Sequence, residues 1–218
     1  PVAEYKTQKR GGRGITGMKQ REEDFVEEMF ICGTHDNILF ITNKGIMYKL
    51  KCYEIPEGSR TSKGMNLVNV VPLMPGEKIN VIIPVTATDE DERYICMITR
   101  GGVVKRTKLS DFKNTRKSGI IAINIDDDDE LGFVRMTNGK QNIFIATRDG
   151  FAIQFKEENV RAMGRNARGV RAINMRAGDR VMDMAIVDEE SRILTVTETG
   201  YGRISSIADY RLQSRGGK

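Results

Sequence analysis

The stretch Ile38-Leu39-Phe40-Ile41-Thr42-Asn43-Lys44-Gly45-Ile46-Met47-Tyr48 joins two β-prone runs through a short polar turn that ends in glycine. Two strands linked by a tight turn with glycine, where φ can be positive, form a β-hairpin. The Thr-x-x-Gly tetrad occurs four times, always after an apolar run, with its glycines at Gly45, Gly102, Gly150 and Gly200. A spacing of roughly fifty residues indicates an array of similar units.

A second element, a basic loop with glycine, keeps the same period. It is complete at Arg10–Gly14, Arg60–Gly64 and Arg165–Gly169, and degenerate at Arg116–Gly119. The chain stops within a further copy, Arg215-Gly216-Gly217-Lys218. A β-prone run follows each internal copy, and we interpret it as an additional strand; these runs are 67–71, 120–123 and 170–173.

Each period therefore predicts about four short strands, so the expected fold class is all-β. Four strands in about fifty residues is the size of a propeller-type blade, and about four blades are expected. Blades bury their apolar faces against their neighbours, so first-strand residues such as Leu39, Ile41, Ile145 and Leu194 should be buried. We treat residues 1–218 as one domain. Since Ala3–Arg13 parallels Ala208–Lys218, we expect the chain to be an excised piece of a longer one.

The composition is typical of a globular protein with reduced thiols. Apolar residues make up 39% of the 218 residues, and 22 glycines against 5 prolines favour tight turns. Three cysteines form no C-x-x-C pair, so we expect buried free thiols in a reducing cytoplasm, with no zinc site or disulfide framework. The first residues resemble neither a signal nor a transit peptide. No apolar run approaches the ~18 residues of a membrane span.

The net charge of +5 is modest, but the positive charge is clustered in the glycine-rich loops. Arg matches phosphate oxygens with a planar fork, Lys adds a point charge, and glycine lets backbone amides approach an anion. Lysines recur six residues after three of the four hairpin glycines and would support the loops from the second strands. The predicted phosphate contacts are Gln8, Lys9, Arg10, Gly11, Gly12, Arg13, Gly14, Lys49, Lys51, Arg60, Lys63, Lys105, Arg106, Lys108, Arg116, Lys117, Lys156, Arg165, Arg168, Arg203, Arg215 and Lys218.

Other kinds of site find little support in the sequence. There is no helix-turn-helix, zinc-finger or P-loop pattern, and the absence of Trp argues against stacking on single strands, which leaves recognition of a duplex backbone. His35, the only histidine, lies in the polar cluster Thr34–Asn37, which predicts a turn. The acidic run Asp126–Glu130 lacks the spacing of a calcium loop and predicts a solvated turn. We expect no catalytic centre, no metal and no cofactor.

The box Gln8-Lys9-Arg10-Gly11-Gly12-Arg13-Gly14 resembles the glycine-rich box of the C-terminal domain of DNA gyrase A, in the type IIA topoisomerase family. The resemblance runs through the whole chain. Further stretches that resemble the family are Thr34–Asp36, Tyr53–Pro56, Ile83–Val85, Val160–Gly164 and Gly200–Gly202.

The resemblance implies a β-pinwheel, a propeller-like ring in which blades exchange a strand. It further implies double-stranded DNA wrapped around a basic perimeter, which enables ATP-dependent negative supercoiling by the holoenzyme. The partners it implies are the rest of gyrase A and the separate protein gyrase B in an A2B2 assembly, where ATP and Mg are used outside this domain. The family usually has six blades, so about four periods leave ring closure undecided.

Three other interpretations stay open at this stage. The first is the related C-terminal domain of topoisomerase IV, against which the intact box at residues 8–14 argues. The second is a propeller that serves as a protein-interaction platform, although the Gly-His and Trp-Asp signatures of such blades are missing. The third is a propeller-type enzyme, which would need converging histidines or carboxylates on axial loops.

Overall fold

The computed structural model describes residues 10–12, 25–59, 61–86 and 93–217, and it is built on four antiparallel hairpins. At each turn the Thr hydroxyl accepts the backbone N–H of the residue after the glycine, as in Thr42 with Ile46 at 3.2 Å. The four glycines all have φ between 74° and 86°, which explains the tetrad. The hairpin strands are β1 (Asn37–Thr42), β2 (Ile46–Lys51), β4 (Tyr94–Thr99), β5 (Val103–Lys108), β8 (Asn142–Thr147), β9 (Ala152–Lys156), β12 (Arg192–Val196) and β13 (Gly202–Ser206).

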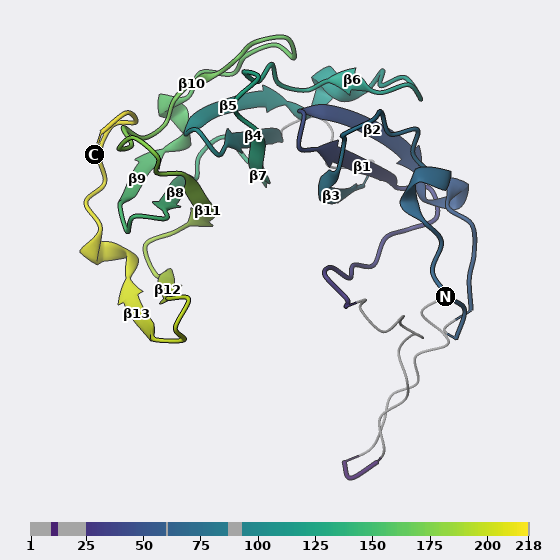
Figure 1. The fold of residues 1–218 in the computed structure, drawn as a ribbon, viewed down its shortest axis with the longest axis horizontal. Coiled ribbons are helices and arrows are strands. Elements are labelled where there is room, and N and C mark those ends of the chain that lie inside the picture. The colour runs from purple at the N-terminus through teal and green to yellow at the C-terminus, as the bar shows by residue number, and fades with distance from the viewer. Residues whose placement is uncertain (1–9, 13–24, 60, 87–92, 218) are drawn as a thin grey trace.

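A third strand lies beside the first strand of three hairpins. β3 (Ile79–Val85) pairs with β1, β7 (Leu131–Thr137) pairs with β4, and β11 (Val181–Val187) pairs with β8. Each of these pairings has a register irregularity close to the hairpin turn. All three strands lie on the inner side of the arc that the molecule forms (Figure 1).

A fourth strand is exchanged between neighbouring blades. β6 (Ile120–Ile121) follows β5 in the chain but pairs with β2, and β10 (Val170–Arg171) follows β9 but pairs with β5. The first blade therefore has the strand order β3-β1-β2-β6, and the second has β10-β5-β4-β7. The third blade, β11-β8-β9, receives Leu212 in an isolated parallel bridge to Gln154. This exchange confirms the pinwheel that the resemblance implied.

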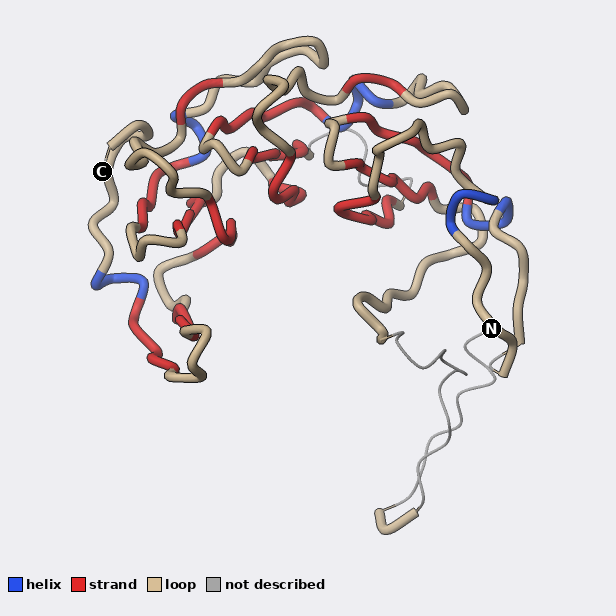
Figure 2. The backbone as a smooth tube through the Cα atoms, viewed as in Figure 1, coloured by secondary structure: helices blue, strands red, loops and turns tan. Residues whose placement is uncertain are grey.

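Short 3-10 helices follow the second hairpin strands, as the helical segments in Figure 2 show. They are η2 (Cys52–Glu54), η5 (Leu109–Phe112), η6 (Glu157–Asn159) and η7 (Ile207–Asp209). The expected strand at 67–71 is wrong, because η3 (Leu67–Asn69) forms there instead, with the Asn66 side chain capping the N–H of Val68. No helix among the described residues is long and apolar enough to cross a membrane.

The core lies between successive blades. On β4, Ile95 and Met97 pack into a cluster shared with the first blade, whereas Cys96 and Ile98 pack into one shared with the third. A strand that alternates between two buried faces reads as an uninterrupted apolar run, and this is why all four residues are apolar. The blades follow an open arc (Figure 1). Leu39, Ile41 and Ile145 are buried, as predicted.

The burial expected for Leu194 is wrong, since 64% of this residue is exposed. Within the described residues β12 pairs with β13 alone, so no third strand and no further blade cover this side chain. The thiols also differ from one another. All three are free, but only Cys96 is fully buried, whereas Cys32 and Cys52 are half-buried.

Candidate nucleic-acid interface

Two of the glycine-rich loops, Arg116–Gly119 and Arg165–Gly169, lead into the exchanged strands on the convex side of the arc (Figure 1). Gly119, with φ +82°, ends the loop that precedes β6, and a Cβ there would lie 2.7 Å from the Tyr48 ring. At Gly169, before β10, a Cβ would lie 2.6 Å from the Val104 carbonyl oxygen. These two glycines are therefore required by the close approach of each loop to the hairpin of the preceding blade. A Cβ at Gly11 or Gly64 would meet no atom within 4 Å.

Hydrogen bonds join the segment after each exchanged strand to the next glycine-rich loop. Asn124, just after β6, donates its backbone N–H to Ala167 and its side-chain amide to Asn166 at 2.6 Å. One repeat further on, the N–H of Asn174 donates to Gly217 at 2.9 Å. The segment that follows β6 is thus adjacent to the loop around Arg165, and the segment that follows β10 is adjacent to the loop around Arg215. We call this row of loops, with β6 and β10, the convex rim.

Lys105 does not lie on the surface, so its expected contact with phosphate is wrong. It is fully buried, and its Nζ donates to the carbonyl oxygens of Ala122, at 2.7 Å, and of Arg165. Burial lowers the pKa of Lys105 to about 8. This ammonium group holds the end of β6 and the loop around Arg165 together from beneath.

Arg106 is a second correction, because it is 8% exposed and engaged on several sides. Its NH1 lies 3.5 Å from Oε2 of the buried Glu157, and its guanidinium lies 4.6 Å from the centroid of the Tyr94 ring. A buried arginine with a carboxylate and an aromatic face stabilises the blade and is not available to a phosphate.

Lys49 and Lys51 are half-buried, and Lys49 binds two backbone carbonyl groups whereas Lys51 binds one. Lys49 Nζ donates to Phe112 O at 3.3 Å and to Lys113 O, both in the second blade. Lys51 Nζ donates to His35 O at 3.0 Å. The cluster 34–37 does form a turn, in which the N–H of Asp36 donates to Gly33 O. These two lysines thus have a structural role, whatever else they contact.

The remaining described candidates lie at the surface. Arg165 is half-buried, and the exposed ones are Arg10, Gly11, Gly12, Lys63, Lys108, Arg116, Lys117, Lys156, Arg168, Arg203 and Arg215. Of these, Lys117 pairs with Glu54 at 3.0 Å, Arg168 pairs with Asp126, and Arg215 Nε donates to Asn159 O at 3.0 Å. The side chains of Lys108 and Lys156 make no ion pair or hydrogen bond with the residues that the structure describes. Gln8, Lys9, Arg13, Gly14, Arg60 and Lys218 lie outside the described residues.

One periodic set of cations escaped the sequence interpretation. Lys113, Arg161 and Arg211 occupy the same position in successive repeats, directly after or near the end of a 3-10 helix, and all three are exposed. Counting eleven residues from each of the last three hairpin glycines would have found them, whereas the same count from Gly45 reaches Pro56. Arg171 adds an exposed cation on β10 itself.

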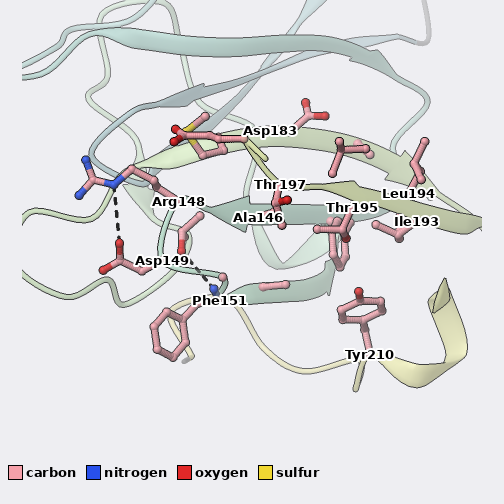
Figure 3. Close-up of a pocket in the computed structure, with 18 of the residues that line it drawn as sticks. Ala146, Arg148, Asp149, Phe151, Asp183, Ile193, Leu194, Thr195, Thr197 and Tyr210 are labelled. Atoms are coloured by element: carbon pink, nitrogen blue, oxygen red, sulfur yellow. Dashed lines mark hydrogen bonds and ion pairs between the residues drawn. The ribbon is translucent and has the colours of Figure 1, made fainter. Parts of the chain in front are cut away.

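Other features of the described chain offer no competing centre. Asp126–Glu130 forms the expected turn, in which Asp129 accepts the N–H of Gly101 at 2.8 Å, and no group of metal-ligating side chains is found in the described ranges. An open crevice separates the third blade from β12, with Ala146, Leu194 and Tyr210 among its mostly apolar walls (Figure 3). Arg148, in the wall of this crevice, is paired with Asp149 at 3.6 Å. The crevice marks the uncovered edge of the last hairpin.

Comparison with known proteins agrees with this repeat architecture. The family model of the DNA gyrase C-terminal domain, a beta-propeller, matches residues 1–32, 36–85, 93–138, 141–188 and 191–218. The chain belongs to this family. Each complete match from residue 36 to 188 contains one hairpin and one third strand, and the matches 93–138 and 141–188 also contain an exchanged strand, so the units of the gyrase family coincide with the repeats seen here.

Relatives within the gyrase family cover the whole chain. DNA gyrase A of Staphylococcus epidermidis is 46% identical over 220 aligned positions, which include 100% of this chain and 25% of the relative. DNA gyrase A of Staphylococcus aureus gives the same values. The chain thus spans about a quarter of the length of these curated relatives.

Solved structures from gyrase and its relative show the same fold. The structure of a DNA gyrase A C-terminal domain has a TM-score of 0.72 at 27% identity, over 99% of this chain and 69% of that one. The crystal structure of a topoisomerase IV C-terminal domain has a TM-score of 0.79 at 28% identity, over 85% of this chain and 58% of that one. The fold is therefore shared by both enzymes, whereas the family model that matches in sequence is that of gyrase.

Proposed function

We propose that this chain binds duplex DNA without sequence preference along the convex rim and bends it around the arc. One observation carries the proposal: the segments that follow β6 and β10 are hydrogen-bonded to the next glycine-rich loops, and exposed Arg and Lys side chains lie in or beside the row so formed. A curved row of cations supports contact with successive phosphates of a bent duplex. The described residues contribute no recognition helix that could read a base edge.

Within a longer gyrase A protein, this bending would serve negative supercoiling by a gyrase holoenzyme. In that proposal the rest of gyrase A performs DNA cleavage, gyrase B hydrolyses ATP, and the two proteins form an A2B2 assembly. The present chain then acts without a catalytic centre, cofactor or metal of its own. Its place of action would be the cytoplasm.

The first test is the salt dependence of binding to duplexes of mixed sequence. Each neutralised phosphate contributes about −0.9 to the slope of log affinity against log salt, so five loops that each contact one or two phosphates predict roughly −5 to −9. Fluorescence anisotropy with two unrelated sequences of equal length measures both slope and preference. A flat response, or a strong preference for one sequence, would overturn the proposal.

The second test is topological. A nicked plasmid is ligated with and without the bound chain, and the change in linking number reports the sign and extent of wrapping. A positive shift is expected for the gyrase-type function. Binding to the plasmid without any change in linking number would favour a passive DNA-binding domain. If the chain did not bind the plasmid, the alternative of a protein-interaction platform would be favoured.

A further inference from the structure

Two thiols approach each other at the base of the first blade. Cys32 Sγ lies 3.3 Å from Cys52 Sγ, although the residues are 20 positions apart in the chain. Both side chains are half-buried against the apolar cluster that contains Ile38 and Leu50. The third thiol, Cys96, is fully buried in a different cluster, between the second and third blades. The first two cysteines thus form a pair.

We propose that Cys32 and Cys52 form a reversible disulfide that clasps together the two chain segments entering and leaving the first hairpin. The backbone already holds these segments side by side. The N–H of Cys52 donates to Asp36 O at 3.0 Å, and the N–H of Tyr53 donates to Thr34 O at 3.1 Å. A disulfide bond measures about 2.05 Å, so the sulfur atoms need to close a gap of about 1.2 Å, which a small rotation of the side chains provides.

A low-molecular-weight disulfide, such as oxidised glutathione, is the oxidant in this scheme. The Cys52 thiolate attacks one of its sulfur atoms, which forms a mixed disulfide and releases one glutathione thiol. Cys32, once deprotonated, attacks Sγ of Cys52, forms the internal bond and releases the second glutathione. The protein loses two protons and two electrons, and the small disulfide gains them as two thiols.

The surroundings direct this order of attack. Burial, together with the adjacent Cys52, raises the pKa of the Cys32 thiol to about 11, so Cys32 suits the second, resolving role. Burial raises the pKa of Cys96 to about 12 and also removes it from solvent. A small disulfide therefore reacts with the pair and leaves Cys96 reduced.

The clasp lies at the roots of the two segments that carry the loops Arg10–Gly14 and Arg60–Gly64. Cys32 is the first described residue from the N-terminus that packs onto a core cluster, whereas Met29 and Ile31 before it are 83% and 78% exposed. Cys52 begins η2, from which the chain continues to the glycine-rich loop with Lys63. Closing the clasp fixes the point from which each segment leaves the blade. This consequence rests on the proposed function, since both segments carry cations assigned to DNA.

The bond itself is tested without DNA. The full chain is incubated with excess oxidised glutathione, and free thiols, intact mass and proteolytic peptides are measured. We expect loss of two of the three thiols, a mass lower by two hydrogen atoms, and a peptide that links Cys32 to Cys52, all reversed by dithiothreitol. The matched control C96S should give the same link, whereas C32S and C52S should give at most a glutathione adduct. Retention of all three thiols, or adducts without a link in the wild type, would overturn the proposal.

The effect of the clasp is tested by plasmid topology. Oxidised and reduced wild-type protein should differ at least twofold in the linking change per bound chain, and C32S should show no difference under the same two conditions. Equal values in the presence of a proven link would refute the role in DNA binding. If the reduced protein fails to bind DNA at all, the proposed function fails, while the thiol count still decides whether the disulfide forms.

Discussion

The side-chain nitrogen of Lys105 lies 2.7 Å from the carbonyl oxygen of Ala122, and both residues are fully buried. Lys105 belongs to the second hairpin, and Ala122 follows the strand that this repeat adds to the first blade. The same ammonium group also binds the carbonyl oxygen of Arg165, in the loop of the next repeat. One buried lysine thus connects the end of β6 with the loop around Arg165, and it helps to set the distance between these two parts of the convex rim.

Replacing Lys105 by Met should lower the free energy of unfolding by about 1–3 kcal/mol at pH 7, because two buried carbonyl groups lose their donor. The loss should grow as the pH rises. Since burial lowers the pKa of Lys105 to about 8 from 10.5, the unfolded chain binds more protons than the folded one between these values. Through this group, the free energy of unfolding of the wild type therefore rises as the pH goes from about 8 to about 10.5, and the variant lacks that gain.

Urea unfolding of both proteins at pH 7 and pH 10 measures the difference. K108M is the matched control, because Lys108 lies three residues further along and is exposed. It should leave the free energy of unfolding nearly unchanged at both values. A gap between wild type and K105M that narrows with rising pH would contradict the assignment.

Replacing Gly169 by Ala should destabilise the fold by more than about 1 kcal/mol, because φ is +102° and the new Cβ would lie 2.6 Å from Val104 O. G164A is the control within the same loop, since nothing lies within 4 Å of a Cβ there and no positive φ is present. That change should be neutral or stabilising by about 0.4–1 kcal/mol. Thermal or urea unfolding of the two variants decides the matter, and equal losses would show that the loop does not approach the hairpin closely.

The double variant K108A/K156A should weaken DNA binding and reduce the salt slope by about 2, since each lysine is expected to neutralise one phosphate. R135A is the control for charge. Arg135 lies on the inner strand β7, where it pairs with Asp183 of β11 at 3.6 Å, so its loss should barely change affinity. Anisotropy titrations at several salt concentrations compare the variants. If R135A and K108A/K156A weakened binding equally, net charge alone would attract DNA.

Amide hydrogen exchange should be fastest in the hairpin β12–β13 and slowest in β4 and β8. Residues of β4 are buried on both faces and paired on both edges, whereas Leu194, Val196 and Ile204 are at least 60% exposed. Local opening costs little free energy where few apolar contacts are lost. Mass spectrometry of exchanged peptides gives the order, and strong protection of Leu194 would show that another segment covers this edge.

Local chemistry made much of this fold readable from the sequence. The Thr-x-x-Gly tetrads located all four hairpins, because the Thr hydroxyl and a glycine with positive φ are requirements of the turn itself. The run Ile95–Ile98 was readable as a strand because both its faces are apolar. Burial of Leu39 and Ile145 followed from the same pattern.

The sequence by itself determined that the chain is an array of blades with a periodic set of basic loops, because turns and strands depend on neighbouring residues. Only the tertiary structure decided which cations reach the surface. Lys105 and Lys108 look alike in the sequence, but the first is buried where it binds the carbonyl groups of Ala122 and Arg165, and the second is left in solvent. The same applies to Leu194, which stands three residues before its Thr like the buried Phe144 but lacks a covering strand in the described chain. Burial depends on contacts between repeats, and residues far apart along the chain supply them.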